Sequence, residues 1–103
     1  MNTEQAVSAL GALAQETRLD IVRHLVRHGE VGAAAGEIAL AVDASAPRAS
    51  FHLATLEKAG LISSERVSRR IVYRANFDRL GTLLAFLLRD CCADAPAVRR
   101  CCL

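Results

Sequence analysis

The sequence predicts a mainly α-helical protein with one small β-hairpin, and three observations support this fold class. Apolar residues recur at helical spacing in residues 3–13, 16–28 and 78–92. The stretch from Asp43 to Tyr73 contains a helical pattern that stops at Gly60, followed by two short segments with strand-like alternation. Hydrophobic residues make up 52% of the 103 residues but aromatic residues only 4%, so we expect one small core of Leu, Ile, Val and Ala.

Two helices are predicted in the first third of the chain. The first covers residues 3–13, with Thr3 as a suitable N-cap, and the second covers residues 16–28 and ends at Gly29. A weak connector follows, with a short strand expected around Val31. The apolar face of the first helix consists of Ala6, Val7, Leu10 and Leu13.

A short helix, a turn and a second helix are predicted in the middle of the chain. The short helix runs from Glu37 to Val42, and Asp43 and Ala44 form the turn. Ser45 is a suitable N-cap for the second helix, and Pro47 fits its first turn because the N–H that proline lacks would be unpaired there anyway. Helical spacing directs Ala49, Leu53 and Leu56 inward and leaves outward Ala46, Arg48, Ser50, Phe51, His52 and Thr55.

Two strands are predicted after this helix, at Leu61–Val67 and Ile71–Ala75, with Ser68, Arg69 and Arg70 in the turn between them. A helix pair followed by a hairpin is typical of a winged helix-turn-helix. In that fold the second helix enters the major groove of DNA and the hairpin, or wing, lies beside it. The sequence therefore predicts a protein that binds double-stranded DNA.

Basic residues are concentrated in this predicted DNA-binding module. Residues 1–43 contain three Lys or Arg and six Asp or Glu, whereas residues 44–79 contain seven and three. Such a local positive excess favours phosphate contacts. The predicted DNA contacts are Ser45, Arg48, Ser50 and His52 on the helix and Arg66, Arg69, Arg70 and Arg74 on the wing. For His52, packing inside the domain is an equally good alternative.

The last predicted helix begins near Asp78 and carries an apolar stripe too broad for one small domain to cover. The stripe consists of Leu80, Leu83, Leu84, Leu87 and Leu88. The same helix of a second copy would cover it, so we predict a twofold homodimer formed through the N- and C-terminal helices. The alternative is a helix packed wholly inside the monomer. Residues 1–92 are expected to form the DNA-binding and dimerisation domain, and residues 93–103 a cysteine-containing tail.

Several other classes of protein are disfavoured. No nucleophile–base pair, phosphate-binding loop or pair of carboxylates stands at a spacing typical of an enzyme. No signal peptide is seen, and no apolar run reaches the roughly 18 to 20 residues that span a bilayer. We therefore expect a cytoplasmic protein without membrane contact, whose four cysteines are reduced thiols.

Two blocks of the sequence carry a resemblance to a known family: LGALAQETRLDIVRHL, which covers residues 10–25, and residues 45–75. The first block is similar to the second-helix block, and the second to the recognition helix and wing, of the ArsR/SmtB family of metal-responsive winged-helix repressors. The resemblance covers about residues 6–90 and implies a dimeric repressor that holds an operator until an inducer binds. The arsenic-type site on the first helix of the helix-turn-helix is missing, because alanines, Ala39 and Ala41, stand at its two cysteine positions. The zinc-type site of the last helix is missing as well, because residues 78–92 contain no histidine.

The remaining candidate inducer site is the tail, which is similar to that of arsenic-responsive members with C-terminal cysteines. Its predicted ligands are two vicinal pairs, Cys91, Cys92, Cys101 and Cys102. Three thiolates suit As(III), or Sb(III) of the same chemistry, and four suit Zn or Cd. In one straight helix the two pairs would stand about 16 Å apart. A bend at Asp94 and Pro96 would bring them together, or the second pair would come from the partner subunit.

Three alternatives to an arsenic-responsive repressor stay open at this point. The vicinal thiols could make the protein a redox-sensing repressor of the same fold. Cd or Hg could be the inducer in place of As(III). A thiol-rich metal buffer without a DNA-binding role is the third alternative, but it leaves the arginines of the wing unexplained.

Overall fold

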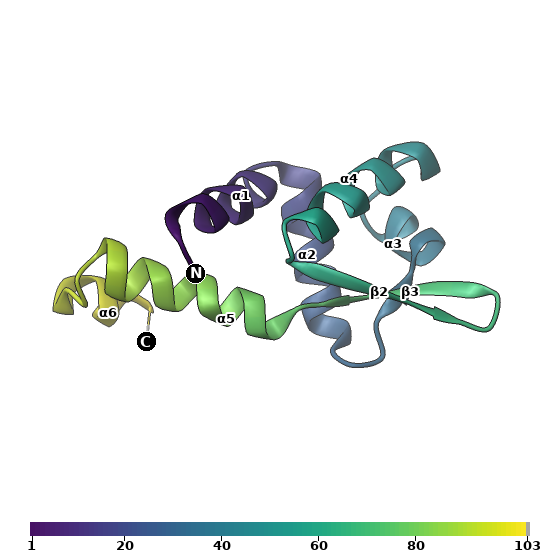
Figure 1. Ribbon diagram of the computed structural model, residues 1–103. Helices are drawn as coiled ribbons and strands as arrows, with labels where there is room; N and C mark the ends of the chain where they lie inside the picture. Colours follow the sequence, from purple (N-terminus) through teal and green to yellow (C-terminus); the bar gives the residue numbers. More distant parts are fainter. Residues whose placement is uncertain (103) are drawn as a thin grey trace.

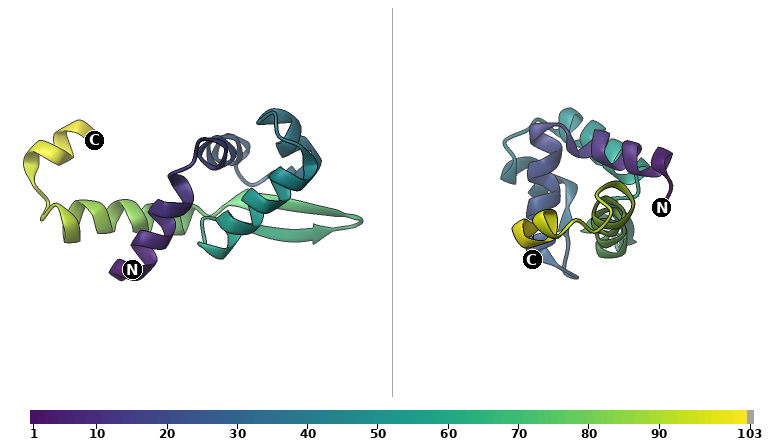
Figure 2. Two further views of the ribbon diagram at one scale, coloured as in Figure 1. Left: turned by 90° about the horizontal axis from the view of Figure 1, so that it is seen from above. Right: turned by 90° about the vertical axis from the view of Figure 1, so that its left-hand side faces the viewer.

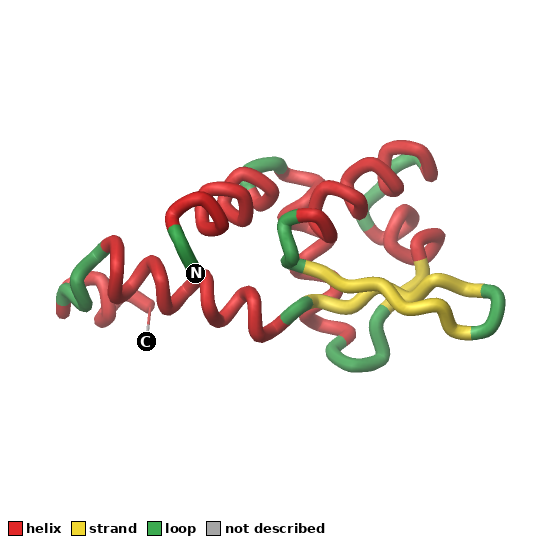
Figure 3. Tube along the Cα trace, viewed as in Figure 1, coloured by secondary structure: helices red, strands yellow, loops and turns green. Residues whose placement is uncertain are grey.

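Helices surround a small antiparallel sheet in the computed structural model, which describes the backbone of residues 1–102 and the side chains of residues 1–100 (Figure 1). In chain order the elements are α1 (Thr3–Leu13), α2 (Glu16–His28), β1 (Ala33–Ala34), α3 (Ala35–Ala41), α4 (Ala46–Lys58), β2 (Ile62–Val67), β3 (Arg70–Ala75), α5 (Phe77–Ala85), the π-helix η1 (Phe86–Cys91) and α6 (Pro96–Cys102). The strands form one sheet in the order β1-β3-β2 (Figure 3). The predicted mainly α-helical fold with a hairpin is confirmed, and the sheet has one strand more.

The molecule is elongated, with principal extents of 46 × 23 × 22 Å. Figure 1 shows why: α5 runs away from the helical core and carries α6 at its far end. The N-terminal end of α4 and the tip of the β2–β3 hairpin lie together at the opposite end, as the turned view on the left of Figure 2 confirms. The two ends of the molecule therefore have separate surfaces.

Helix α1 has the predicted bounds, but its N-cap is Asn2 and not Thr3, which is the first residue of the helix. The Oδ1 atom of Asn2 accepts from the backbone N–H of Gln5 at 2.7 Å, and the Oε1 atom of Gln5 accepts from the N–H of Asn2 at 3.0 Å. This reciprocal pair is a capping box. The buried face of α1 is made of the small residues Ala6, Ala9 and Ala12, whereas Val7 and Leu10 of the predicted apolar face stay 62% and 40% exposed.

The helix-turn-helix consists of α3 and α4, with the turn at Asp43 and Ala44 as predicted. Asp43 has a φ of +54°, and the N–H of Ala44 donates to the carbonyl of Ala39 at 2.9 Å. Ser45 is the N-cap of α4, as predicted, since its Oγ accepts from the N–H of Arg48 at 3.4 Å. Both helices pack on the hydrophobic core. The largest fully buried side chains of this core are Ile21, Leu25, Ile38, Leu53, Leu56 and Leu61.

The wing is a hairpin with a shorter turn than predicted. Val67 pairs directly with Arg70, so Arg70 belongs to β3 and only Ser68, with a φ of +58°, and Arg69 form the turn. The short first strand is β1, two residues later than the strand expected around Val31, and it pairs with β3. A Cβ atom on Gly32 would stand 2.5 Å from the carbonyl oxygen of Tyr73, and its φ is +67°, so only glycine fits where the chain enters β1.

The C-terminal helix changes its character before it ends. Helix α5 passes into the π-helix η1, and the chain then turns at Ala93 and Asp94, which have φ values of +50° and +54°. Helix α6 starts at Pro96 and runs in a new direction (Figure 2, left). The chain therefore bends between the two cysteine pairs, as one of the two alternatives required, whereas the meeting of their thiols stays a prediction. Within residues 1–102 no helix is long and apolar enough to cross a membrane.

His52 points into the domain, which corrects its predicted role as a DNA contact. Its residue surface is only 6% exposed, and its Nδ1 lies 3.2 Å from Nη1 of Arg18. The Nε of Arg18 also donates to the carbonyl of Ala12 at 2.7 Å. Because a guanidinium only donates hydrogen bonds, Nδ1 accepts and the neutral ring carries its proton on Nε2. His52 belongs to the buried face of α4, which consists at regular helical spacing of Ala49, His52, Leu53 and Leu56.

This burial predicts a pH-dependent stability. Desolvation, and then the guanidinium groups of Arg18 and Arg48, lower the pKa of His52 below its ordinary value of 6.5. His52 in the unfolded chain therefore binds a proton more readily than in the folded protein. The contribution of the neutral His52 ring to the free energy of unfolding is thus fully present above pH 6.5 and is lost as the pH falls through the folded-state pKa. We expect the urea concentration at the unfolding midpoint to decrease when the pH is lowered from about 7.5 to about 5. The decrease should be smaller in His52→Gln, because glutamine keeps an acceptor for Arg18 but cannot be protonated.

The matched control is His28→Gln, which removes an exposed histidine and one of the charges that lower the pKa of His24, and which should leave the contribution of His52 unchanged. Equal falls in the wild type and in His52→Gln would show that the buried ring does not contribute. Circular dichroism at each pH would follow the unfolding transition.

Candidate DNA interface and thiol pair

The outer face of α4 presents both polar and apolar groups at the end of the molecule. Arg48 and Ser50 are exposed there, as predicted, and Ser45 stands just before them as the N-cap. Phe51, in the same part of the helix, is 65% exposed. The surface next to the start of α4 thus offers a cation, hydroxyl groups and one aromatic ring.

The wing places two arginines in solvent near its tip. Arg66 and Arg69 are exposed, and neither has a hydrogen-bond or ion-pair partner among the side chains of residues 1–100. Unpaired guanidinium groups at a hairpin tip are suited to bind phosphates, since they present a fork of donors. The tip of the hairpin lies at the same end of the molecule as the N-terminal end of α4 (Figure 1), and Arg48 belongs to the first turn of that helix.

The other two predicted wing contacts are already engaged within the domain. Arg70 pairs with the carboxylate of Glu37 on α3. Arg74 donates through Nε to the carbonyl of Glu30 at 2.6 Å and through Nη1 to Glu65 at 2.9 Å. The bonds to Glu37 and to the carbonyl of Glu30 attach the wing to the rest of the domain, a role that the sequence did not reveal because these residues are far apart in the chain, whereas the bond to Glu65 joins the two strands of the wing.

Glu37 is the residue that sequence reasoning missed in this region. Its carboxylate accepts the N–H of Ala34 at 3.3 Å, at the start of α3, and also pairs with Arg70. One carboxylate thus connects the first helix of the helix-turn-helix to the wing. Exposed ion pairs of this kind stabilise by at most about 1 kcal/mol, so Arg70 can exchange Glu37 for another anion at small cost.

The thiol pair lies at the other end of the molecule. Cys91 is the last residue of η1 and is exposed, Cys92 follows it and is half-buried, and both are free thiols. The turn after them is closed by an ion pair of 3.4 Å between Asp94 and Arg99. Segments of π-helix are rare and are found frequently at functional sites, and nothing in the sequence pattern had indicated one here.

The second predicted thiol pair lies outside the part of the structure in which side chains are described. Cys101 and Cys102 belong to the backbone of α6, but the assignment of their thiols as metal ligands stays a prediction. Among the described side chains, no group of three or more His, Cys, Asp or Glu is placed to hold a metal ion. Cys91 and Cys92 therefore supply two soft donors, and a complete site needs at least one more.

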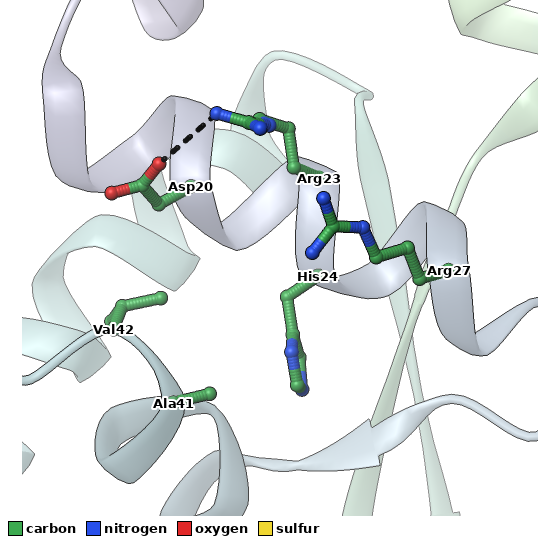
Figure 4. Close-up of a pocket in the computed structure, with 6 residues that line it drawn as sticks. All are labelled: Asp20, Arg23, His24, Arg27, Ala41 and Val42. Carbon is green, nitrogen blue, oxygen red and sulfur yellow. Dashed lines mark ion pairs between the residues drawn. The ribbon is translucent and has the colours of Figure 1, made fainter.

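A shallow pocket of about 200 Å³ lies between α2 and α3 (Figure 4). Its lining residues are Asp20, Arg23, His24, Arg27, Ala41 and Val42. Asp20 and Arg23 face each other across 3.8 Å, and burial, followed by the charges of His28 and Arg27, lowers the pKa of His24. The pocket is smaller than the roughly 300 Å³ at which small-molecule sites begin, and Ala41 supplies no ligand atom from its side chain.

Comparison with known proteins agrees with this geometry. The family model described as a helix-turn-helix domain matches residues 13–65. The HTH-type transcriptional regulator YgaV of Escherichia coli K12 is 34% identical over 91 residues, which is 88% of this chain and 90% of that protein.

Two solved structures show the likeness in three dimensions. An ArsR-like transcriptional regulator from Rhodococcus sp. RHA1 has a TM-score of 0.76 at 30% identity, and the match covers 96% of this chain and 88% of that one. The homodimeric winged helix-turn-helix DNA-binding domain Mb0332 from Mycobacterium bovis has a TM-score of 0.68 at 30% identity, with 88% and 80% covered. The chain therefore belongs to the ArsR family of winged helix-turn-helix transcriptional regulators.

Proposed function

We propose that the protein is a homodimeric repressor that binds double-stranded operator DNA and releases it when As(III) binds to its C-terminal cysteines. The observation that carries the proposal is the free vicinal pair Cys91–Cys92, which follows directly on the π-helix at the end of the C-terminal helix. We place the protein in the cytoplasm, where thiols are kept reduced. Sb(III) has the same preference for thiolates and would act in the same way.

For DNA binding, we assign base and backbone contacts in the major groove to Ser45, Arg48 and Ser50 of α4. Arg66 and Arg69 are assigned to the phosphates, because both are exposed at the wing. Arg70 and Arg74 take part to a smaller degree, because each is engaged within the domain in the free protein. Such a division agrees with the general rule that phosphate contacts position a protein and base contacts specify the sequence.

The wing assignment predicts a change in the salt dependence of binding. Arg69→Ala should weaken binding to all duplexes and lower the slope of log K against log salt by about 0.9 for each phosphate that is no longer neutralised, or about 1.8 per dimer. The matched control is Arg89→Ala, the same change at an exposed arginine of η1, at the other end of the molecule. Fluorescence anisotropy with a labelled duplex at several salt concentrations measures both slopes. An unchanged slope in Arg69→Ala would show that this arginine of the wing does not contact the phosphates.

A dimer is proposed because apolar side chains stay exposed on neighbouring helices. Val7 and Leu10 of α1 are 62% and 40% exposed, and Leu84 of α5 is 61% exposed. Figures 1 and 2 show α1 beside α5 in more than one view. A second copy would cover this surface, and the solved Mb0332 domain is a homodimer. Twofold symmetry would place two recognition helices about one turn of DNA, roughly 34 Å, apart.

We therefore expect Leu84→Glu to convert the dimer into a monomer, because it places a charge in a surface that the dimer would bury. The control is Val31→Glu, at a residue that is 80% exposed in the connector before β1. Sedimentation analysis should give twice the chain mass of 11.1 kDa for the wild type and for Val31→Glu. A monomeric wild type, or a dimeric Leu84→Glu, would contradict this surface.

The arsenic proposal is supported by the chemistry and the position of the thiols. Thiolate is the soft ligand type that soft ions select, and Cys91 and Cys92 supply two of them. A third, or a third and a fourth, would come from Cys101 and Cys102 of the same or the partner subunit. The same helix continues from the thiols into α5, whose Leu83 is buried in the core and whose Leu84 lies on the proposed dimer surface. Ligation at this end can therefore alter how the two subunits are set against each other.

A coupling of about 1–3 kcal/mol between the two sites would weaken operator binding about 5- to 150-fold. We expect arsenite to cause such a loss in the wild type. The double variant Cys91→Ser/Cys92→Ser should bind the same duplex with unchanged affinity and keep it in arsenite. The variant Cys101→Ser/Cys102→Ser shows whether the second pair is needed, and each variant is also tested with Cd and with peroxide.

The outcomes separate the proposal from its competitors. Release of DNA from Cys91→Ser/Cys92→Ser by arsenite would exclude the first thiol pair as the inducer site. Release by peroxide without any response to arsenite would make the protein a redox sensor. Release by Cd alone would assign the same tail to a divalent metal. Gel shift with a duplex selected by the wild-type protein from a random pool is a suitable readout.

A further inference from the structure

The recognition helix carries an exposed aromatic ring that the proposed polar contacts do not use. Phe51 is 65% exposed on α4, beside Ser50 and one helical turn from Arg48 and Thr55. Exposing a large apolar side chain contributes nothing to the stability of the free protein, since burial is what stabilises it. Its position between residues assigned to the major groove makes DNA the partner that would cover it.

The ring is supported from inside the domain. Phe51 meets the ring of His52 edge to face, with the centroids 5.6 Å apart and the planes inclined by 64°. His52 is buried and bound to Arg18, so the base of the Phe51 ring rests against a fixed group. Thr55, one turn further along the helix, donates its Oγ to the backbone carbonyl of Phe51 at 3.1 Å. The contact with the fixed ring of His52 limits the positions that the exposed Phe51 ring can take.

The major groove offers such a ring one kind of partner. Guanine, cytosine and adenine show hydrogen-bonding groups there, and only thymine adds an apolar group, its 5-methyl. A phenyl ring cannot satisfy the donors and acceptors of the other edges, so it would disfavour them by leaving them desolvated. The cation of Arg48, three residues before Phe51, and the exposed Arg66 and Arg69 of the wing supply the attraction to phosphate that brings the ring to the bases.

We propose that Phe51 reads a thymine in each operator half-site by packing on its 5-methyl group. The inference rests on the proposed binding of operator DNA by α4 and adds the base that this helix prefers. A second copy of the chain stacked on Phe51 is the competing occupant, and the experiment separates the two.

The test combines a change in the protein with removal of single methyl groups from the DNA. The probe is a duplex selected by the wild-type protein from a random pool, in which each thymine is replaced in turn by deoxyuridine. At one position in each half-site, the wild type should lose about fourfold in affinity, the effect of one methyl group that is no longer buried. Phe51→Ala should bind the original duplex more weakly and show no loss at that same position. Phe51→Leu, which keeps an apolar side chain, should retain part of the loss.

Val31→Ala is the matched control, since it removes an apolar side chain that is 80% exposed away from α4, and it should retain the full fourfold effect. Equal sensitivity of the wild type and Phe51→Ala to every replacement would overturn the inference, as would a selected duplex without thymine in its half-sites. In both cases an ordinary salt-dependent affinity for duplex DNA would leave the proposed function intact. A change in sedimentation of Phe51→Ala without DNA would assign the ring to contact between copies of the chain.

Discussion

One guanidinium, that of Arg18, joins the parts of the molecule that must act together. It starts from α2, bonds the carbonyl of Ala12 at the end of α1 and reaches His52 in the middle of α4. Helix α1 carries part of the exposed apolar surface assigned to dimerisation, and α4 carries the residues assigned to DNA. Both hydrogen bonds are partly buried, where breaking one costs more than at the surface. The relative position of dimer surface and recognition helix therefore depends on this side chain.

The position of the wing is likewise set by bonds from arginine side chains to the rest of the domain. Glu37 of α3 binds Arg70 near the hairpin tip, and the carbonyl of Glu30 accepts from Arg74 further in, so the hairpin is attached to the rest of the domain at two points. Arg66 and Arg69, which lie near the tip beside Arg70, have no such partner among the side chains of residues 1–100. The same residue type thus serves two purposes in one hairpin. Which purpose applies is decided by whether an acceptor of the domain lies within reach.

The groups assigned to DNA and the thiol pair are separated by the length of the molecule. DNA-facing groups lie at one end and the pair Cys91–Cys92 at the other, connected by α5 and η1 (Figure 1). Ala39 and Ala41 leave the first helix of the helix-turn-helix without thiols. In the proposed function, a signal from the tail would travel through the C-terminal helix and the subunit contact, and a rare π-helix stands at the start of that path.

The sequence by itself determined the order of the helices, the turn at Asp43 and Ala44, the cap at Ser45 and the hairpin, because these depend on local spacing, capping and turn chemistry. Tertiary structure alone decided the inward turn of His52, since its partner Arg18 is 34 residues away. It also decided the pairing of Arg70 with Glu37 and the position of β1, two residues after the strand expected around Val31, because both depend on neighbours brought together by folding. Helical periodicity tells which residues share a face, but a polar residue on the inner face is accepted only where the fold supplies its hydrogen-bond partner.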